Sequence, residues 1–387
     1  MISAKQMGCR VFLVTSKKLE NKPWPRAHLD DVFYMNQNED GEWNLNDLVA
    51  GLAHVMKGVV VDRIVALDDF DVEKAAHLRE HFRIPGMGQT TARHFRDKLA
   101  MRLKAAEAGI NVPPFCALFN DAQIHEYTQQ VPPPWLVKPR SAASATGIKK
   151  IHSVEELWEH LNHKLGHDRH NFLIEQFAPG NVFHIDALSV DGKVIFARVS
   201  QYLNTPFEVA HGGGIFRSCS VLHQSDEEKA ILKMNQAVLK AFGMRFSASH
   251  TEVIKNNETG KLYFLETSSR VGGAHIAELV EASSGINLWK EWAIIETCMA
   301  KSKPYQLPAV KKDYGGIIIS LTKQEEPDDS MFNDPEIHWR LKGNEYHIGF
   351  IVKSNSRERI LQLLDNYAQK IYADFHASAP APDKPVL

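Results

Sequence analysis

Two glutamates, Glu252 and Glu266, lie on either side of a turn in a stretch that predicts a β-hairpin. Residues 250–255 and 261–267 alternate in polarity and are rich in β-branched and aromatic side chains, as strands are. The sequence NNETG between them is typical of a turn. If the turn centres on Thr259, the strands pair antiparallel and Glu252 lies directly opposite Glu266.

Two opposed carboxylates need compensation, because cross-strand neighbours have Cβ atoms about 5 Å apart and like charges so placed destabilise a hairpin. The pattern has two interpretations. Either the glutamates form an outer face on which both charges are solvated, or they hold a divalent cation. Carboxylate oxygens are ligands that Mg²⁺ prefers. In the second case Arg270, four residues after Glu266, brings a further positive charge to the same place.

The composition is that of an ordinary globular protein. The 387 residues are enough for two or three domains, and the hydrophobic fraction of 44% and charged fraction of 24% are common values. The net charge of −2 and the absence of a long basic run disfavour nucleic-acid binding. The four cysteines are scattered without a CxxC pair, which disfavours a zinc ribbon or a thioredoxin-type site and favours a reducing cytoplasm.

The sequence also disfavours a membrane protein. It contains no apolar run near the roughly 20 residues of a membrane span, and residues 1–10 lack the apolar core of a signal peptide. We therefore expect a cytoplasmic protein that binds no membrane. Residues 1–10 resemble the end of a helix that leads into a strand at 10–16. Because an α/β domain usually opens with a strand, we expect the first strand and most of the first helix to precede Met1.

The first 95 residues predict a small α/β domain with a parallel sheet. Strand-like and helix-like segments alternate along it, at residues 10–16, 45–56, 61–69 and 71–82. Gly86 and Gly88 lack the third glycine of a dinucleotide-binding loop and predict a plain turn. Residues 92–109 then predict one amphipathic helix that Gly109 ends.

The rest of the chain predicts an α+β arrangement. Besides the hairpin, we expect strands within 132–151, 171–180, 182–203, 315–321 and 347–354. Helices are expected within 153–165, 224–244, the second half of 279–300, and 356–375. These elements divide the chain into residues 1–95, 96–301 and 302–375, followed by a Pro/Ala-rich tail at 376–387 that we expect to be disordered.

A run of four histidines with helical spacing follows one of these helices. They are His160, His163, His167 and His170. One interpretation is a metal site on one helix face. The other, which we favour, is a solvated helix end, because Gly166 interrupts the helix.

Three features before the hairpin have the chemistry of a nucleotide site. Lys98 begins a predicted helix, and Lys138 ends a predicted strand that the small residues 141–147 follow. Small residues let backbone N–H groups approach phosphate oxygens, and a lysine adds a compact positive charge. The apolar strand that ends at residues 175–177 offers backbone groups to the edge of a base. Each feature alone is common in other proteins. The three features followed by the hairpin, in this order, are far more specific.

In this order the features resemble the ATP-grasp superfamily, and within it the carboxylate–amine ligases that include the L-amino-acid ligases. The resemblance covers most of the chain and is strongest from Lys98 to Ala300. The family's His-x-Glu strand corresponds to HTE at 250–252, and its Glu-x-Asn-x-Arg pattern to ETSSR at 266–270, which RVGGAHI continues. The implied fold class is α/β and α+β: two α+β subdomains that clasp ATP, behind an N-terminal Rossmann-like pre-ATP-grasp domain.

The resemblance implies a role for each of these residues. Glu252 and Glu266 would hold Mg²⁺. Glu266 and Arg270 would act in catalysis, with Arg270 stabilising an acyl phosphate or the substrate carboxylate. Lys98 and Lys138 would contact the ATP phosphates. The remaining ATP contacts would come from a mobile flap and from a hinge that reads adenine largely through its backbone: Ser141, Ser144 and Gly147 in the flap, and Glu175, Gln176 and Phe177 in the hinge.

Two positions depart from the family's pattern. Ser268 stands where the family usually has a metal-binding asparagine. We therefore expect one or two Mg²⁺ ions, or Mn²⁺ in their place, with Ser268 as a possible further ligand. Val182 stands where the family often has a glutamate that contacts the ribose, and Asp186 or Asn181 is the expected replacement.

Substrate-binding residues are expected around the three glycines at 212–214, which allow a loop to adapt or close. His211 and Arg217 flank these glycines, and either can orient an acid or take a proton from an amine. The alternative interpretation is an ordinary loop at a domain edge. His275, after the glycines of RVGGAH, is a candidate of the same kind.

The resemblance thus implies an enzyme that uses ATP to join an amino acid or another small carboxylic acid to an amine. Phosphoryl transfer makes an acyl phosphate, whose phosphate leaves when the amine attacks. One alternative is a biotin-carboxylase-like enzyme, which the lack of a biotin-carrier sequence disfavours. The other is a nucleotide-binding module without catalysis, which Ser268 and Val182 favour. The expected partners are small-molecule substrates and a second copy of the chain in a homodimer.

Overall fold

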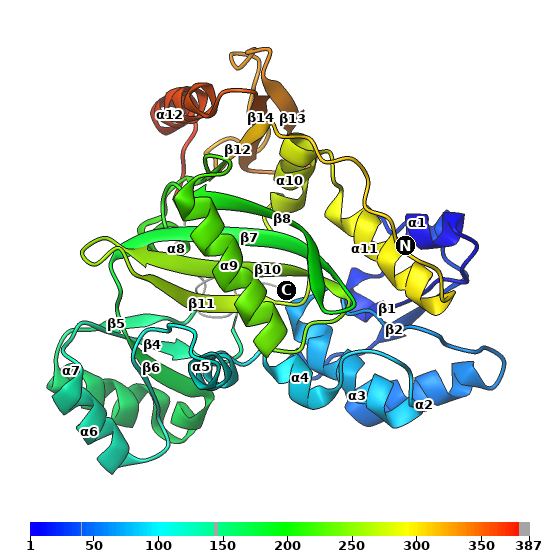
Figure 1. Ribbon diagram of the computed structural model, residues 1–387, viewed down its shortest axis with the longest axis horizontal. Helices are drawn as coiled ribbons and strands as arrows, with labels where there is room; N and C mark the ends of the chain where they lie inside the picture. The colour runs from blue at the N-terminus through cyan, green and yellow to red at the C-terminus, as the bar shows by residue number, and fades with distance from the viewer. Residues whose placement is uncertain (40, 143–145, 379–387) are drawn as a thin grey trace.

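The computed structural model describes residues 1–39, 41–142 and 146–378, which form three β-sheets with helices around them (Figure 1). The N-terminal part contains the smallest sheet, in which β1 (Phe12–Ser16) runs parallel to β2 (Asp31–Met35). Before and after this sheet lie α1 (Ile2–Gln6), α2 (Leu45–Met56) and α3 (Val72–Phe82). Strands and helices alternate in this part, as the sequence predicts.

Residues 61–69, however, are not the strand that the sequence predicts. All of them are described, and they join no sheet. The carbonyl of Ile64 accepts a 3.1 Å hydrogen bond from the Arg79 side chain instead of one from a neighbouring strand. Val65 still packs against a core cluster, so this apolar run contributes packing rather than pairing. The second strand of the small sheet is β2, which was not identified from the sequence.

The single helix predicted at 92–109 is two helices, α4 (Gln89–Arg93) and α5 (Lys98–Glu107). Asp97 explains the break, because its side chain accepts hydrogen bonds from the backbone N–H groups of Leu99 and Ala100 and so caps a new helix. Lys98 is therefore the first residue of α5, and it begins a helix as predicted.

A four-stranded antiparallel sheet forms a subdomain at the lower left of Figure 1. Its strands, in spatial order, are β3 (Phe115–Ala117), β6 (Phe172–Gln176), β4 (Trp135–Pro139) and β5 (Lys149–Ile151). Helices α6 (Asp121–Gln130) and α7 (Val154–Glu159) pack against it around the fully buried Trp135. A π-helical turn (His160–Leu165) and a 3₁₀ turn (Gly166–Asn171) follow α7.

Eight antiparallel strands form the central sheet, and the pairing of β9 with β12 joins the C-terminal part of the chain to it. In spatial order the strands are β11 (Leu262–Ser268), β10 (Ser247–Asn256), β7 (Gly180–Val190), β8 (Lys193–Tyr202), β9 (Phe216–Ser220), β12 (Tyr314–Leu321), β14 (His347–Ser354) and β13 (Ile337–Arg340). All but β9 and β13 coincide with strands predicted from the sequence.

Helices cover both faces of this sheet (Figure 1). One face carries α9 (Asp226–Ala241) and α12 (Arg357–Asp374), and the other carries α10 (Ile276–Ser284) and α11 (Leu288–Ala300). The sequence predicted α11 but not α10. Successive residues of a strand point to opposite faces of the sheet. Cys219 of β9 points to one face and packs beneath α12. Leu188 of β7 and Ala248 of β10 point to the other face and pack beneath α10 and α11.

Among the described helices we find none whose length and apolar content would let it cross a lipid bilayer.

Candidate active site

The predicted hairpin is present as β10 and β11, and Glu252 pairs with Glu266 across it. A register shift, or β-bulge, follows this pair between Glu252 and Val253. Bulges redirect side chains and are common beside active sites. The prediction that two carboxylates face each other on this hairpin is therefore confirmed.

Lys98 supplies positive charge to this pair. Its Nζ lies 2.8 Å from Oε2 of Glu266 and donates a 2.7 Å hydrogen bond to the carbonyl of Ala142. Burial raises the pKa of Glu266, but Lys98 and Lys138 outweigh it and lower the pKa to about 2. Glu266 is therefore ionised at neutral pH, while 33% of its side chain stays exposed to a ligand.

Glu252 is held at one of its two oxygens. The Tyr202 hydroxyl donates a 2.9 Å hydrogen bond to Oε1, and Nε2 of His250 lies 3.7 Å from the same atom. Burial alone would lower the pKa of His250, but Asp186 outweighs it and raises the pKa to about 10. The imidazole is thus positively charged at neutral pH and faces Oε1 of Glu252 as a cation.

The second lysine, Lys138, lies in a buried ion cluster with Glu175 and Arg102. Lys138 pairs with one oxygen of Glu175, and Nε and Nη2 of Arg102 lie 3.0 and 2.8 Å from the other. Burial raises the pKa of Glu175, but the two cations outweigh it and hold the pKa below its ordinary value. The side chain of Glu175 is thus a counter-ion that keeps Lys138 charged against its own burial, which lowers the lysine's pKa.

The predicted adenine-reading hinge has two of its backbone donors already in use. The N–H of Gln176 donates to the carbonyl of Pro114 at 2.8 Å, and the N–H of Phe177 donates to that of Pro134 at 3.0 Å. Nζ of Lys150 lies 3.7 Å from the centre of the Phe177 ring. A base at this edge would therefore have to use hinge carbonyls or the backbone beyond Phe177, and the hinge stays a prediction.

The predicted flap is described only in part. Ser141 is exposed, whereas Ser144 lies outside the described residues. Gly147 has a φ of +71°, and a Cβ there would lie 2.9 Å from Cγ of Pro139. A larger residue at 147 would therefore be strained and would collide. Lys98 joins the start of this segment to the hairpin through its bond to Ala142.

The guanidinium of Arg270 is bound by an acid from the N-terminal part of the chain. Its Nε donates a 3.0 Å hydrogen bond to Oδ2 of Asp69, and Nη1 donates to the carbonyl of Val271 at 2.9 Å. Within the described residues, Oδ1 of the buried Asp69 has no partner. Asp69 fixes the orientation of Arg270, and this contact was not identified from the sequence.

The structure does not bring Arg217 to the pair of glutamates. In β9, Ser218 points toward His184, so the neighbouring Arg217 points to the opposite face of the sheet. There its Nη1 donates a 2.8 Å hydrogen bond to Asp365 of α12, and its Nη2 donates to Asn204 at 3.2 Å. The segment was interpreted as a loop, and in a loop this strict alternation of faces does not apply.

We therefore expect Arg217→Ala to leave ATP-dependent phosphate release unchanged. The ion pair with the largely exposed Asp365 is partly solvated, so its loss lowers the free energy of unfolding by less than about 1 kcal/mol. Phosphate release by this variant and by Arg270→Ala, each checked for folding by thermal unfolding, tests the assignment. Equal losses of turnover in the two variants would contradict it.

The two histidine candidates stay predictions. His211 lies in α8 (Pro206–Gly212), and its side chain lies outside what the structure describes. His275 is the N-cap residue directly before α10 and has a φ of +59°, after Ala274 at +50°. Two successive residues other than glycine in this region strain the backbone, and such strain clusters at functional sites. The His275 ring lies 4.6 Å from that of Trp339.

The two departures from the family's pattern have different surroundings. Ser268 pairs with His250 and is half-buried, close to the glutamates along both strands, so its role as a metal ligand stays a prediction. Val182 packs with Tyr202 and Ile254 in an apolar cluster. It therefore fills the core and makes no polar contact with a ribose.

The surroundings of Asp186 offer no open oxygen for the expected ribose contact. Its side chain is fully buried, and its two oxygens lie 2.7 Å from Nδ1 of His184 and 2.8 Å from Nδ1 of His250. Both carboxylate oxygens are thus already bound. Asn181, the other expected replacement, is exposed at the start of β7.

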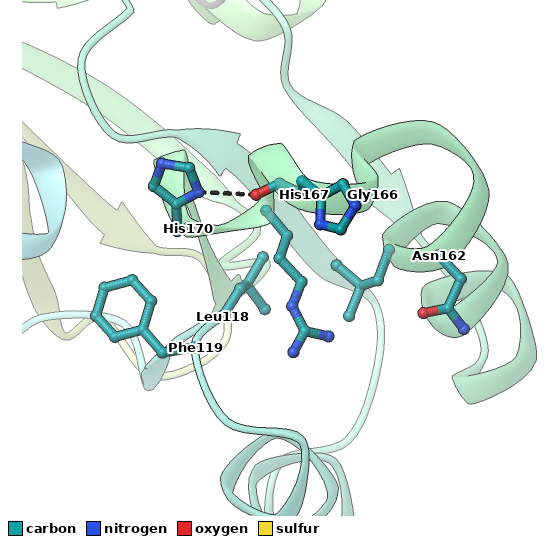
Figure 2. Close-up of a pocket in the computed structure, with 8 residues that line it drawn as sticks. Leu118, Phe119, Asn162, Gly166, His167 and His170 are labelled. Carbon is teal, nitrogen blue, oxygen red and sulfur yellow. Dashed lines mark hydrogen bonds between the residues drawn. The ribbon is translucent and has the colours of Figure 1, made fainter.

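The four histidines between residues 160 and 170 are all described, and they are not spaced to hold a metal. A cavity of about 490 Å³ includes the end of this run, in the smaller subdomain (Figure 2). Nδ1 of His170 lies 2.8 Å from the carbonyl of His167 (Figure 2). Within the described residues, the one group of three or more His, Cys, Asp or Glu side chains spaced to hold a metal is His184, Asp186 and His250. The histidine run is therefore a helix end. The cavity, which no candidate site residue lines, is formed by Leu118, Phe119, Leu161, Asn162, Gly166, His167, Arg169 and His170.

Comparison with known proteins supports the fold class that the sequence predicts. Residues 105–207 match the family model of the D-ala D-ala ligase C-terminus. The structure resembles that of the L-amino acid ligase from Bacillus licheniformis, with a TM-score of 0.75 and 18% identity over 97% of this chain and 94% of the other. The chain has the ATP-grasp fold. The fold class predicted from the sequence is therefore confirmed.

Two further known proteins are similar to this chain. The L-arginine-specific L-amino acid ligase of Bacillus subtilis is 28% identical over 271 residues, which are 68% of this chain. The chain spans only 64% of the length of that relative. The biotin carboxylase domain of Hydrogenobacter thermophilus 2-oxoglutarate carboxylase, a dimer solved with MgADP and bicarbonate, has a TM-score of 0.68 and 16% identity over 97% of this chain and 87% of that one.

Proposed function

We propose that this ATP-grasp protein is an ATP-dependent ligase that joins a small carboxylic acid, in particular an amino acid, to an amine through an acyl phosphate. The observation that carries the proposal is the opposed pair Glu252 and Glu266 with the Nζ of Lys98 at 2.8 Å from Glu266. The similarity to two L-amino acid ligases supports an amino acid as the acid that is activated.

The hairpin carboxylates fit Mg²⁺. They supply the oxygen ligands that this ion takes, Glu266 is ionised and partly exposed, and the ammonium of Lys98 already lies beside it as a cation. We propose that Glu252 and Glu266 hold one or two ions, with Ser268 as a further oxygen ligand. When bound, Mg²⁺ would neutralise negative charge on the ATP phosphates.

The lysines are held in place before any substrate arrives. The backbone N–H of Lys98 donates to the carbonyl of Arg140 at 2.8 Å, and Asp97 caps the helix that Lys98 begins. Lys138 is fixed by Glu175. Charges that are already oriented stabilise a phosphoryl-transfer transition state without the cost of reorganising during the reaction. Both lysines would therefore bind phosphoryl oxygens.

Arg270 would orient the carboxylate that is phosphorylated. Asp69 holds its guanidinium from one side, close to the end of the hairpin strand that carries Glu266. A guanidinium binds a carboxylate or a phosphoryl group through two parallel hydrogen bonds, which fixes the geometry of the reacting group. Transfer of the γ-phosphoryl group to that carboxylate then makes phosphate the leaving group when the amine attacks.

The proposal is tested by phosphate release from Mg·ATP across a panel of amino acids, alone and in pairs. We expect release that requires both an acid and an amine, with ADP and an amide as products. Release that requires bicarbonate and biotin instead would establish the carboxylase-like alternative. If ATP binds tightly but no combination of substrates causes phosphate release, bicarbonate with biotin included, catalysis would be contradicted. A nucleotide-binding module would then be favoured.

A further inference from the structure

A chain of polar side chains crosses the central sheet on the face that carries the two glutamates. Nε2 of His184 lies 2.7 Å from Oγ of Ser218, and Nδ1 of His184 lies 2.7 Å from Oδ2 of Asp186. The other oxygen of Asp186 lies 2.8 Å from Nδ1 of His250, whose Nε2 faces Glu252 at 3.7 Å. The chain therefore links β9, β7 and β10 and ends at a proposed metal ligand.

The polar side chains of this network would be costly to bury without hydrogen-bonding partners. Ser218, His184 and Asp186 are fully buried, although the same face of the sheet is filled by apolar side chains beneath α10 and α11. Polar groups are buried without a large cost only when each has a hydrogen-bonding partner. Ser218, His184 and Asp186 each have a hydrogen-bonding partner on both sides, so these three form a satisfied network, and His250 at its end lies 3.7 Å from Glu252.

The backbone closes over the middle of the network. A Cβ added to Gly272 would lie 2.8 Å from Oδ1 of Asp186 and 2.9 Å from Nδ1 of His250. The loop after Arg270 therefore packs directly on the contact between the two side chains and leaves no room for a larger residue. The two imidazoles approach different oxygens of Asp186 at hydrogen-bond distance, so the carboxylate holds both rings by itself.

At the hairpin, the network ends at Glu252. Among the described residues, Glu252 contacts Tyr202 and His250, in both cases through Oε1. This leaves Oε2 free to bind a cation. Groups that hold the ligands of a metal typically change its affinity 10–100-fold when they are removed.

We propose that Asp186, supported by His184 and Ser218, holds His250 against Oε1 of Glu252 and so positions this glutamate to bind the metal through Oε2. Asp186, His184 and Ser218 would be positioning residues, because in this proposal Glu252, and none of these three, binds the metal. This inference rests on the proposed function, since it assumes that Glu252 is a metal ligand.

The test measures Mn²⁺ binding by electron paramagnetic resonance, with the full chain and a non-hydrolysable ATP analogue. We expect Asp186→Asn to weaken Mn²⁺ binding about tenfold, the lower end of the range for groups that hold metal ligands. Ser218→Ala should weaken it less, because Ser218 acts on His250 only through His184 and Asp186. The matched control is Ser249→Ala. Ser249 is equally buried in the same sheet, adjoins His250 in sequence, and has no partner for its hydroxyl within the described residues.

The outcomes separate the inference from the proposed function. Wild-type Mn²⁺ affinity in a folded Asp186→Asn would overturn the inference. If that variant does not fold, Ser218→Ala decides, because equal affinities in Ser218→Ala and Ser249→Ala would also overturn it. Weaker binding in Ser218→Ala alone, with the same thermal unfolding as Ser249→Ala, supports positioning over general destabilisation. A wild-type chain that binds no Mn²⁺ with the analogue would overturn the proposed function and this inference with it.

Discussion

Replacing Glu266 with glutamine is expected to lower the proposed ligase turnover about 100-fold or more while the fold persists. Glu266 is ionised at neutral pH because Lys98 and Lys138 lower its pKa to about 2 despite burial. An amide keeps the shape of the side chain but loses the charge that would bind Mg²⁺. Loss of one oriented electrostatic contact in an active site typically costs on the order of 3 kcal/mol of barrier, or about 100-fold in rate.

The hairpin offers a matched control for this change. Glu258→Gln makes the same substitution in the exposed turn of the same hairpin, outside the site. Phosphate release and thermal unfolding would be measured for both variants with the substrates that the wild type accepts. Near-wild-type turnover in Glu266→Gln would refute the metal assignment. A similar loss in Glu258→Gln would show that the hairpin tolerates no change and that the effect is not specific to the site.

The hairpin could be predicted because its determinants are local. The alternation of polarity sets the strands, and the turn is held by Asn256, whose side-chain oxygen accepts hydrogen bonds from the N–H groups of Glu258 and Thr259. Asn is a common turn residue for this reason. With the turn fixed, the register that pairs Glu252 with Glu266 follows from counting.

The residues that surround this pair could not be predicted in the same way. Tyr202 and Asp69 contact Glu252 and Arg270 from 50 and 201 positions away in the chain. These contacts depend on the strand order β10-β7-β8 and on how the N-terminal part packs, and neither is a local property of the sequence.

One signal for the polar network was present in the sequence. His184 and Asp186 stand at alternate positions of the apolar strand β7, so both must point to the same face of the sheet. Polar residues with this spacing inside a buried strand indicate a shared internal contact. Arg217 is the opposite case, because the nearby glycines indicate a loop where a central strand begins.

The second large effect is expected from Glu175→Gln, which should destabilise the protein by about 3–5 kcal/mol at neutral pH. Glu175 is the shared counter-ion of Lys138 and Arg102, and all three side chains are at least nine-tenths buried. A glutamine would turn its NH₂ group toward one of two cations and leave both charges uncompensated. The free energy of unfolding in denaturant measures this loss.

Glu291→Gln is the matched control, because Glu291 is equally buried but accepts a 2.7 Å hydrogen bond from the neutral hydroxyl of Tyr305. An amide oxygen accepts that bond as well, so the control should lose far less stability. Equal losses of unfolding free energy in the two variants would mean that the burial of the glutamate, and not its place in the ion cluster, determines the effect.

The pH dependence of Glu175→Gln gives an independent check. Burial raises the pKa of Glu175, but Arg102 and Lys138 outweigh it and hold the folded-state pKa below the unfolded value. The contribution of the carboxylate is therefore fully present above the ordinary glutamate pKa of about 4.3 and is lost as pH falls through the lower folded-state value. The stability difference between wild type and variant should shrink below about pH 4. A difference that stayed constant through this range would show that the charge of Glu175 does not hold the two cations in place.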